Sequence, residues 1–513
     1  MKSTKTRQPV ANRFVELSRN ENQARGIARY ALDFCGGQLP GPSAAVMEKT
    51  ARFHLDSVAC GVAALAIRAN APMVLRQEAC EFPSSVGTVC LGSSTPVHPE
   101  KSVLANCSAV RELDANGTNF GFNPRTGHQR GEFGHNDFYP VVMAGCAQAK
   151  SDGNTALRAM VCLDEIRGRL AEVFALKDHK IDHVVHGAIA STAVYGALRR
   201  ATVEQIESAI GMVVAHFVPF RAIRAGHQLS DSKGASAALS SEMAVSSMRR
   251  AMRGFMGPAD IFRNPQSLFC LFEPPENEDC GPFDLELATG GDDFAVMGMH
   301  FKLGLYEHQS AGAIQALINL ASTSPRLVDR EDHIQHVKIT IYEPAFGIIG
   351  DPAKRDPRTR QSADHSMVYI IATLIRKAIE IGTASWDSLM LVPDDYNEQA
   401  LFNQQTRRIM ERIEFVHGGP SYDEMYPDGI PTTLEIDHQS LGNQSSGLVM
   451  YPSGHARSDD THLGEIMRIK FERLTSLGVD EPAALFTRLA NIGSATPDEI
   501  ATLYSFPIRG LDD

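Results

Sequence analysis

The first half of the sequence consists largely of alanine-rich segments in which apolar residues recur every three or four positions. One such set, after the helix-start signal Pro42-Ser43, is Val46, Phe53, Val58, Val62 and Leu65. The segments 190–200, 203–214 and 235–252 have the same texture. This spacing places apolar residues on one face of a helix, and alanine favours helices that pack closely on other helices. The sequence therefore predicts a large helical domain up to about residue 270.

The pattern changes after 272–293, a segment rich in Pro, Gly and acidic residues that we interpret as a linker. Beyond it, apolar and polar residues alternate at 337–341 and again at 434–436, which is typical of half-buried strands. A helix is predicted between these strands, opened by Ser366 and ended by Gly382. The segment 463–490 is helical again, so we expect the C-terminus to return to the first domain.

These patterns predict two domains, which also suits a chain of 513 residues. We expect a large all-α domain that is discontinuous in sequence, formed by residues 1–280 and 460–513. We expect a smaller α+β domain over residues 285–459.

Charge and composition exclude several classes of function. Asp and Glu outnumber Lys and Arg by 61 to 49, so a phosphate backbone would be repelled and we predict no nucleic-acid partner. No apolar run approaches the roughly 18 residues that span a bilayer, which predicts a soluble protein with no membrane partner. The motifs of nucleotide-binding loops and of serine hydrolases are missing, and we expect no cofactor.

Nine cysteines are present without any C-x-x-C pair, which disfavours a disulfide framework, a zinc knuckle and an iron–sulfur cluster. Reduced thiols suit a cytosol-like compartment. The N-terminal segment 1–13 is basic and has no acidic residue, so it resembles either the start of an organelle transit peptide or a solvated tail. We favour the tail because the segment lacks an amphipathic pattern. We therefore expect a cytoplasmic protein, or a mitochondrial one if the source is eukaryotic.

Two polar stretches follow an apolar helix predicted at 102–110. The stretch 111–118 contains Asp114 and Thr118, and a Gly- and Asn-rich loop then leads to His135. A capped helix end followed by a long surface loop would explain these residues. Long loops are also where active sites gather, so both interpretations stay open.

Two further histidines stand together before an alanine-rich helix. His183 and His186 are three positions apart and could share a metal ion on one helix face. The sequence lacks an H-E-x-x-H pattern and an obvious third ligand, so a hydrogen-bonded structural histidine is the ordinary interpretation. We predict no metal site, and we retain a metal-dependent hydrolase only as an outside alternative.

The loop 220–234 is strongly basic and precedes the predicted helix 235–252. Its basic residues are Arg221, Arg224, His227 and Lys233. A helix N-terminus already favours anions, so added cations make this loop a candidate receptor for carboxylate or phosphate groups. A lysine at a helix start opposes the helix dipole, so we expect Lys233 to have an anionic partner or a catalytic function. A solvated basic loop is the alternative.

The stretch 301–310 opens the second domain and carries His308. Capping and helix-start roles explain Ser310, Asp364 and Ser366. They do not explain His308.

Several of these motifs resemble the MmgE/PrpD family. The most specific are Asp182-His183, Lys233-Gly234, Arg355-Asp356-Pro357, Ala363-Asp364-His365-Ser366 and Tyr426-Pro427-Asp428-Gly429-Ile430-Pro431. The resemblance implies a large all-α domain, an α+β lid domain, an active site between them that needs no metal, and a homodimer. By motif it assigns functional roles to Asp114, Thr118, His135, His183, Lys233 and His308. The loop between Thr118 and His135 is longer than is usual in the family, and Gly117 stands where Asp is common, which suggests a reshaped pocket mouth.

The resemblance further implies dehydration of 2-methylcitrate to 2-methyl-cis-aconitate, as in propionate breakdown. This reaction needs a base for the proton α to a carboxylate, an acid for the leaving hydroxyl, and cations for three substrate carboxylates. We expect His183 or Asp114 as the base, His135 as the acid, and Lys233 to stabilise charge. We expect substrate binding by Thr118, Arg221, Arg224, His227 and His308. Alternatives are decarboxylation or epimerisation of a related polycarboxylate, and a non-catalytic binding or scaffold protein.

Overall fold

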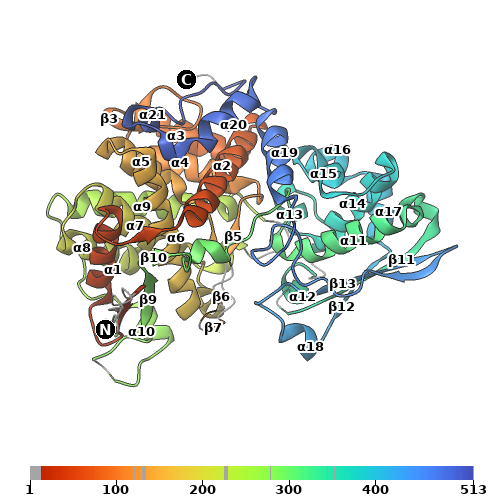
Figure 1. Ribbon diagram of the computed structural model, residues 1–513, viewed down its shortest axis with the longest axis horizontal. Helices are drawn as coiled ribbons and strands as arrows, with labels where there is room; N and C mark the ends of the chain where they lie inside the picture. The colour runs from red at the N-terminus through yellow and green to blue at the C-terminus, as the bar shows by residue number, and fades with distance from the viewer. Residues whose placement is uncertain are drawn as a thin grey trace, which may run out of the picture.

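The computed structural model describes residues 13–119, 122–123, 125, 128–129, 134–224, 229–277, 279–343, 345–350 and 354–511. Within them, a helix-rich N-terminal part lies beside a C-terminal part built around a small sheet (Figure 1). The helices of the N-terminal part are α1 (Gln23–Cys35), α2 (Ala44–Ala66), α3 (Asn70–Cys80), α4 (Pro99–Glu112), α5 (Tyr139–Ala149), α6 (Gly153–Val173), α7 (Val184–Leu198), α8 (Val203–His216), α9 (Ser232–Ala251) and α10 (Leu268–Phe272). The helix-rich, two-part architecture predicted from the sequence is confirmed.

Helix α7 forms the centre of the N-terminal part. All of its residues are buried, and it packs against α1, α5, α6, α8 and α9. Its small and apolar side chains cover the whole circumference, as expected for a helix surrounded by other helices. The predicted helices at 46–65 and 203–214 lie within α2 and α8, and the predicted helix 235–252 matches α9 except for its last residue. Ser43 caps α2 by accepting a hydrogen bond from the Val46 N–H.

No single helix among the described residues is long and apolar enough to cross a membrane. Helices α2 and α3 reach the required length and composition only when taken together, and they are bent by 91° relative to each other.

The N-terminal part is not purely helical, because it also contains short pairs of strands. Strand β1 (Phe14–Leu17) pairs antiparallel with β9 (Leu285–Ala288), and β2 (Gly41–Pro42) pairs with β10 (Gly290–Gly291). The other pairs are β3 (Pro83–Val89) with β4 (Pro96–Val97), β5 (Thr118–Asn119) with β8 (Gly134–His135), and β6 (Phe122–Asn123) with β7 (His128–Gln129). The end of the predicted linker is thus attached to the helical part rather than starting the second domain. The cause is the apolar alternation of Leu285 and Leu287, which are both buried.

The C-terminal part contains a four-stranded sheet with the order β12-β11-β13-β14. Its strands are β11 (Ile334–Ile341), β12 (Ile413–His417), β13 (Thr432–His438) and β14 (Gly442–Ser445). Strand β11 pairs parallel with β12 and antiparallel with β13. The predicted alternation is confirmed, since Val337, Ile339 and Ile341 are buried while Lys338 pairs with Glu435 on the neighbouring strand β13.

Helices cover this sheet and continue to the end of the chain. They are α11 (Ala311–Thr323), α12 (Ala345–Ile348), α13 (Arg360–Ala363), α14 (Met367–Ile381), α15 (Trp386–Leu389), α16 (Glu398–Leu401), α17 (Gln404–Met410), α18 (Pro420–Asp423), α19 (Leu463–Thr475), α20 (Pro482–Ala490) and α21 (Pro497–Ala501). Helix α14 has the ends predicted for it. The Ser366 hydroxyl accepts from the Tyr369 N–H, and Gly382 ends the helix with a φ of +76° that favours glycine.

The last helices pack on the N-terminal part. Helices α19 and α20 contact α2, and α21 contacts α5 (Figure 1). The buried apolar residues of both parts form one continuous core. The exact domain boundaries, 1–280 with 460–513 for the first domain and 285–459 for the second, remain predictions.

Candidate active site

A cavity of about 70 Å³ lies where the two parts of the chain meet. Its lining residues are Arg111, Asp114, His183, Arg221, Leu229, Lys233, Glu307, Gln309, Ile348, Lys354 and His365. We call it the catalytic cavity. Asp114, His183, Arg221 and Lys233, all predicted from the sequence as site residues, are therefore brought together here.

Asp114 lies just after the end of α4 and is surrounded by cations. Its carboxylate lies 2.8 Å from the Arg111 guanidinium, 2.5 Å from Lys302 Nζ and 3.6 Å from Lys233 Nζ. Burial alone would raise the pKa of Asp114, but these three cations outweigh it and hold that pKa well below its usual range. Asp114 is thus a permanent carboxylate that fixes the positions of three positive charges.

Lys233 stands in the first turn of α9 and is buried. Its ammonium lies 3.4 Å from Asp364 Oδ1 in addition to its contact with Asp114. Burial lowers the pKa of Lys233, and the two carboxylates oppose this effect. The expectation of an anionic partner for this lysine is confirmed.

His365 links the two carboxylates. Its Nδ1 lies 2.6 Å from Asp364 Oδ1 and its Nε2 lies 3.1 Å from Asp114 Oδ2. Burial and the neighbouring Lys233 ammonium lower the pKa of His365 to about 4. The imidazole is therefore neutral near pH 7, and the adjacent carboxylates would stabilise the imidazolium formed when it accepts a proton.

Glu307 and Gln309 enter the cavity from the turn before α11. Glu307 Oε2 accepts a hydrogen bond of 2.9 Å from the Gln309 backbone N–H. Burial raises the pKa of Glu307 to about 7, although Lys302 opposes the shift. A carboxyl group with this pKa is partly protonated near neutral pH and can donate a proton.

A buried lysine of the C-terminal helices connects the chain segments that form the site. Lys470 of α19 pairs with Asp56 at 2.6 Å and donates to the backbone carbonyls of Ala115 at 2.6 Å and Lys302 at 2.7 Å. Those carbonyls belong to the segments that carry Asp114 and the Lys302 ammonium. One side chain of α19 thus fixes two segments that are far apart in the sequence.

His183 and Arg221 lie on neighbouring segments of the N-terminal part. His183 directly precedes α7, and its Nδ1 lies 3.5 Å from Asp182 Oδ1. Arg221 starts a short 3₁₀ turn and is positioned by its backbone N–H, which donates to the Lys180 carbonyl at 2.8 Å.

The remaining predicted residues are placed differently. Thr118 is buried and pairs through its backbone with His300 and with His135, and it does not line the catalytic cavity. His308 is also buried but stacks on His300, with ring centroids 5.2 Å apart. Only the backbone is described for His135 and Arg224, and His227 lies outside the described residues.

The sequence reasoning missed His365, Asp364, Glu307, Gln309 and Lys302 as site residues. The motif Ala363-Asp364-His365-Ser366 contains two of these residues. A helix-start role alone explained Asp364, so no catalytic or binding role was assigned to it. The structure confirms that role for Ser366 and contradicts it for Asp364, whose carboxylate pairs with Lys233 and His365. Ser310 also makes no side-chain cap to α11. The Lys233 partner of Asp364 comes from a distant segment, which local pattern rules do not address.

Comparison with known proteins agrees with this architecture. The MmgE/PrpD N-terminal domain matches residues 25–278, and the MmgE/PrpD C-terminal domain matches residues 306–489. The chain belongs to the MmgE/PrpD family.

Two fungal proteins are similar to the chain at low identity. The 2-methylcitrate dehydratase-like protein oryR of Aspergillus oryzae is 23% identical over 314 residues, 60% of this chain and 59% of its own length. The alkylcitrate dehydratase phiI of a fungal species is 25% identical over 346 residues, 64% of this chain and 62% of its own length. The chain therefore spans about 60% of the length of these relatives.

The catalytic cavity of this MmgE/PrpD protein does not suit a metal ion. Asp114, Asp364 and His365 are close enough to share one. The carboxylates are already paired with Lys233, Lys302 and Arg111, so a divalent cation would meet a cluster of positive charge.

The other potential ligand groups fit a metal no better. His438 Nδ1 accepts backbone N–H groups of Ser440 and Leu441, so its proton is on Nε2, the nitrogen that faces Asp329. His186 Nε2 lies 2.8 Å from the Phe174 carbonyl and donates to it, which is a structural role rather than a ligand role beside His183.

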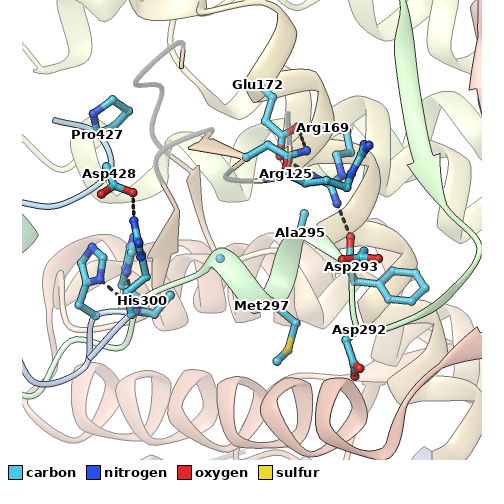
Figure 2. A pocket seen from close by; sticks show the side chains of 17 residues that line it. Arg125, Arg169, Glu172, Asp292, Asp293, Ala295, Met297, His300, Pro427 and Asp428 are labelled. Carbon is cyan, nitrogen blue, oxygen red and sulfur yellow. Dashed lines mark hydrogen bonds and ion pairs between the residues drawn. The ribbon is translucent and has the colours of Figure 1, made fainter. Parts of the chain in front are cut away.

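A second, larger cavity of about 190 Å³ also lies between the two parts of this family member. In Figure 2, Arg125, Arg169, Glu172 and Asp293 lie at one end and Pro427 and Asp428 at the other. Its charged groups already have partners: Arg169 pairs with Glu172 at 2.7 Å, Arg457 with Asp428, and Arg125 with Glu286. We call it the paired-charge cavity.

Proposed function

We propose that this chain is a hydro-lyase that dehydrates a citrate-like tricarboxylate, with 2-methylcitrate as substrate and 2-methyl-cis-aconitate as product. One observation carries the proposal: the described residues that line the cavity combine more cations than carboxyl groups with a neutral imidazole and a carboxyl group whose pKa is raised by burial to about 7. The printed names of the two fungal relatives, a 2-methylcitrate dehydratase-like protein and an alkylcitrate dehydratase, support the same reaction class.

The cations would bind the substrate carboxylates. Arg111, Arg221, Lys233 and Lys354 line the cavity against the carboxyl groups of Asp114 and Glu307. Guanidinium groups bind carboxylates through paired N–H donors, and a buried ammonium stabilises the charge that develops on a carboxylate when its α-proton is lost.

An imidazole is the best base in the cavity. The pKa of Asp114 is held so low that its carboxylate is a weak base. We propose that Asp114 instead orients the surrounding cations. His365 and His183 both line the cavity, and His365 is neutral with two carboxylates to stabilise its protonated form. We propose that one of these imidazoles removes the proton.

Glu307 is the proposed acid. The C–H electron pair forms the new C=C bond, the imidazole keeps the proton, and the C–O bond breaks with its electron pair on oxygen. The Glu307 proton joins that oxygen, and one water molecule leaves. The imidazolium then releases its proton to solvent, and the Glu307 carboxylate takes up a proton from solvent, so both groups return to their starting states. No step needs a metal ion. A homodimer and a cytoplasmic location are part of the same proposal.

Incubation of the purified, chelator-treated protein with 2-methylcitrate, citrate and cis-aconitate tests this function. Ultraviolet absorbance follows the conjugated double bond and NMR identifies the products. We expect 2-methyl-cis-aconitate to form without added metal. Loss of activity on chelation that returns with a metal would contradict the metal-free mechanism, and failure of all three substrates to react would contradict the substrate class.

A further inference from the structure

Gln309 is a buried polar side chain of the catalytic cavity, and its amide atoms make no hydrogen bond to the part of the chain that the structure describes. Its side chain lines the cavity and is fully buried. Neither the amide oxygen nor the amide nitrogen has a hydrogen-bond partner among the described residues. Its backbone, in contrast, is held by the Glu307 carboxyl group. Buried polar groups in folded proteins are nearly always paired, so a missing partner beside a cavity points to a bound ligand.

The chemistry of an amide restricts what that partner can be. The arginines and lysines around the cavity only donate hydrogen bonds, which suits the carboxylates of a substrate. An amide both donates and accepts. A carboxylate would satisfy the N–H group of Gln309 but would repel its carbonyl oxygen, whereas a hydroxyl group can pair with either atom.

We propose that Gln309 binds the hydroxyl group of the substrate and so selects hydroxylated tricarboxylates over those that lack this group. The inference rests on the proposed function and adds the residue that recognises the leaving group. Gln309 is two residues from Glu307, and both line the cavity. The same turn would therefore orient the hydroxyl and deliver the proton with which it leaves.

Selectivity follows from burial. A site that hydrogen-bonds a substrate hydroxyl rejects the analogue lacking it, because the buried amide would then stay unpaired. The catalytic cavity should therefore distinguish citrate from propane-1,2,3-tricarboxylate, which carries three carboxylates and no hydroxyl.

Isothermal titration of these two ligands into the full-length protein tests the proposal. We expect citrate to bind at least roughly tenfold more tightly than propane-1,2,3-tricarboxylate. In Gln309→Leu, which keeps the size and removes both polar atoms, citrate affinity should fall about tenfold while the affinity of the hydroxyl-free ligand stays within about threefold. The exposed residue Gln404 of α17 gives the matched control, Gln404→Leu, which should bind both ligands like the unaltered protein.

The outcomes separate the two proposals. Equal losses for both ligands, or no loss in Gln309→Leu, would overturn the role of Gln309 and leave the dehydratase proposal standing. Failure of the unaltered protein to bind either ligand would overturn the substrate class and this inference with it. Thermal unfolding checks that Gln309→Leu is folded, and Gln309→Met provides a second apolar replacement if it is not.

Discussion

The catalytic cavity and the paired-charge cavity lie between the same two parts of the chain but use charge in opposite ways. Lys233 and Asp114 of the catalytic cavity each have a side chain that is 1% exposed, whereas Arg457 of the paired-charge cavity is 46% exposed. Among the described lining residues, cations outnumber carboxyl groups around the first cavity, and carboxylates slightly outnumber cations around the second. The paired-charge cavity is therefore not expected to bind an anionic ligand. The catalytic cavity contains buried positive charge that a bound polycarboxylate would neutralise.

The strongest test of this contrast removes one cation from each cavity. Lys233→Met should lower kcat/KM by about a thousandfold or more, because a buried charge that stabilises the transition state is lost. Arg457→Met should change kcat/KM by less than about threefold, because an exposed ion pair contributes little. Steady-state kinetics measures both. Near-normal turnover in Lys233→Met, or an equal loss in Arg457→Met, would break the contrast.

The catalytic cavity also depends on the buried ion pair between Lys470 and Asp56. Lys470→Met should lower the free energy of unfolding by about 3–5 kcal/mol, because it leaves the Asp56 carboxylate buried without a partner. Urea denaturation measures the loss. Arg468→Met on the same helix breaks an exposed pair with Glu472 and should cost less than about 1 kcal/mol. Equal effects of the two substitutions would show that burial does not distinguish them.

The pH dependence tests whether Glu307 acts as an acid. Burial raises its pKa to about 7, so the protonated form is present below that pH and is lost above it. We expect kcat/KM to fall as the pH rises through about 7, and to fall again at low pH as the base, if it is His365, is protonated near 4. Glu307→Gln should reduce kcat about a hundredfold and abolish the alkaline decline. An alkaline decline that persists in Glu307→Gln would assign the acid to another group.

The smallest expected effect concerns the rim of the catalytic cavity. Arg221 is only partly buried, so Arg221→Met should raise KM about tenfold and leave kcat nearly unchanged, as expected when ground-state and transition-state binding are lost equally. Arg330→Met, at an exposed pair with Asp332, is the control and should alter neither constant. A fall in kcat with constant KM would place Arg221 at the reacting centre instead.

The sequence predicted the features that depend on local patterns. Helix α14, with Ser366 and Gly382 at its ends, and the alternating strands β11 and β13 follow from spacing that a few neighbouring residues define. Lys233 was found because a lysine at a helix start is unfavourable without a partner.

Long-range contacts explain what the sequence could not supply. Lys302 and Asp114 are 188 residues apart, and Lys470 and Asp56 are 414 apart, so no local rule links them. Gln309 looks ordinary in the sequence, and what sets it apart is a buried amide with no hydrogen-bond partner among the residues that the structure describes. Capping rules also explained Asp364 too readily, which concealed its pairing with Lys233.

The position of Lys470 has a consequence for how the protein is made. A ribosome synthesises the segments of Asp114 and Lys302 long before α19, yet Lys470 donates to a backbone carbonyl in each segment. The nascent chain therefore lacks an assembled catalytic cavity until its last helices emerge and dock on α2. Translation that stops before α19 should release a polypeptide that carries all of the proposed catalytic groups and has no activity.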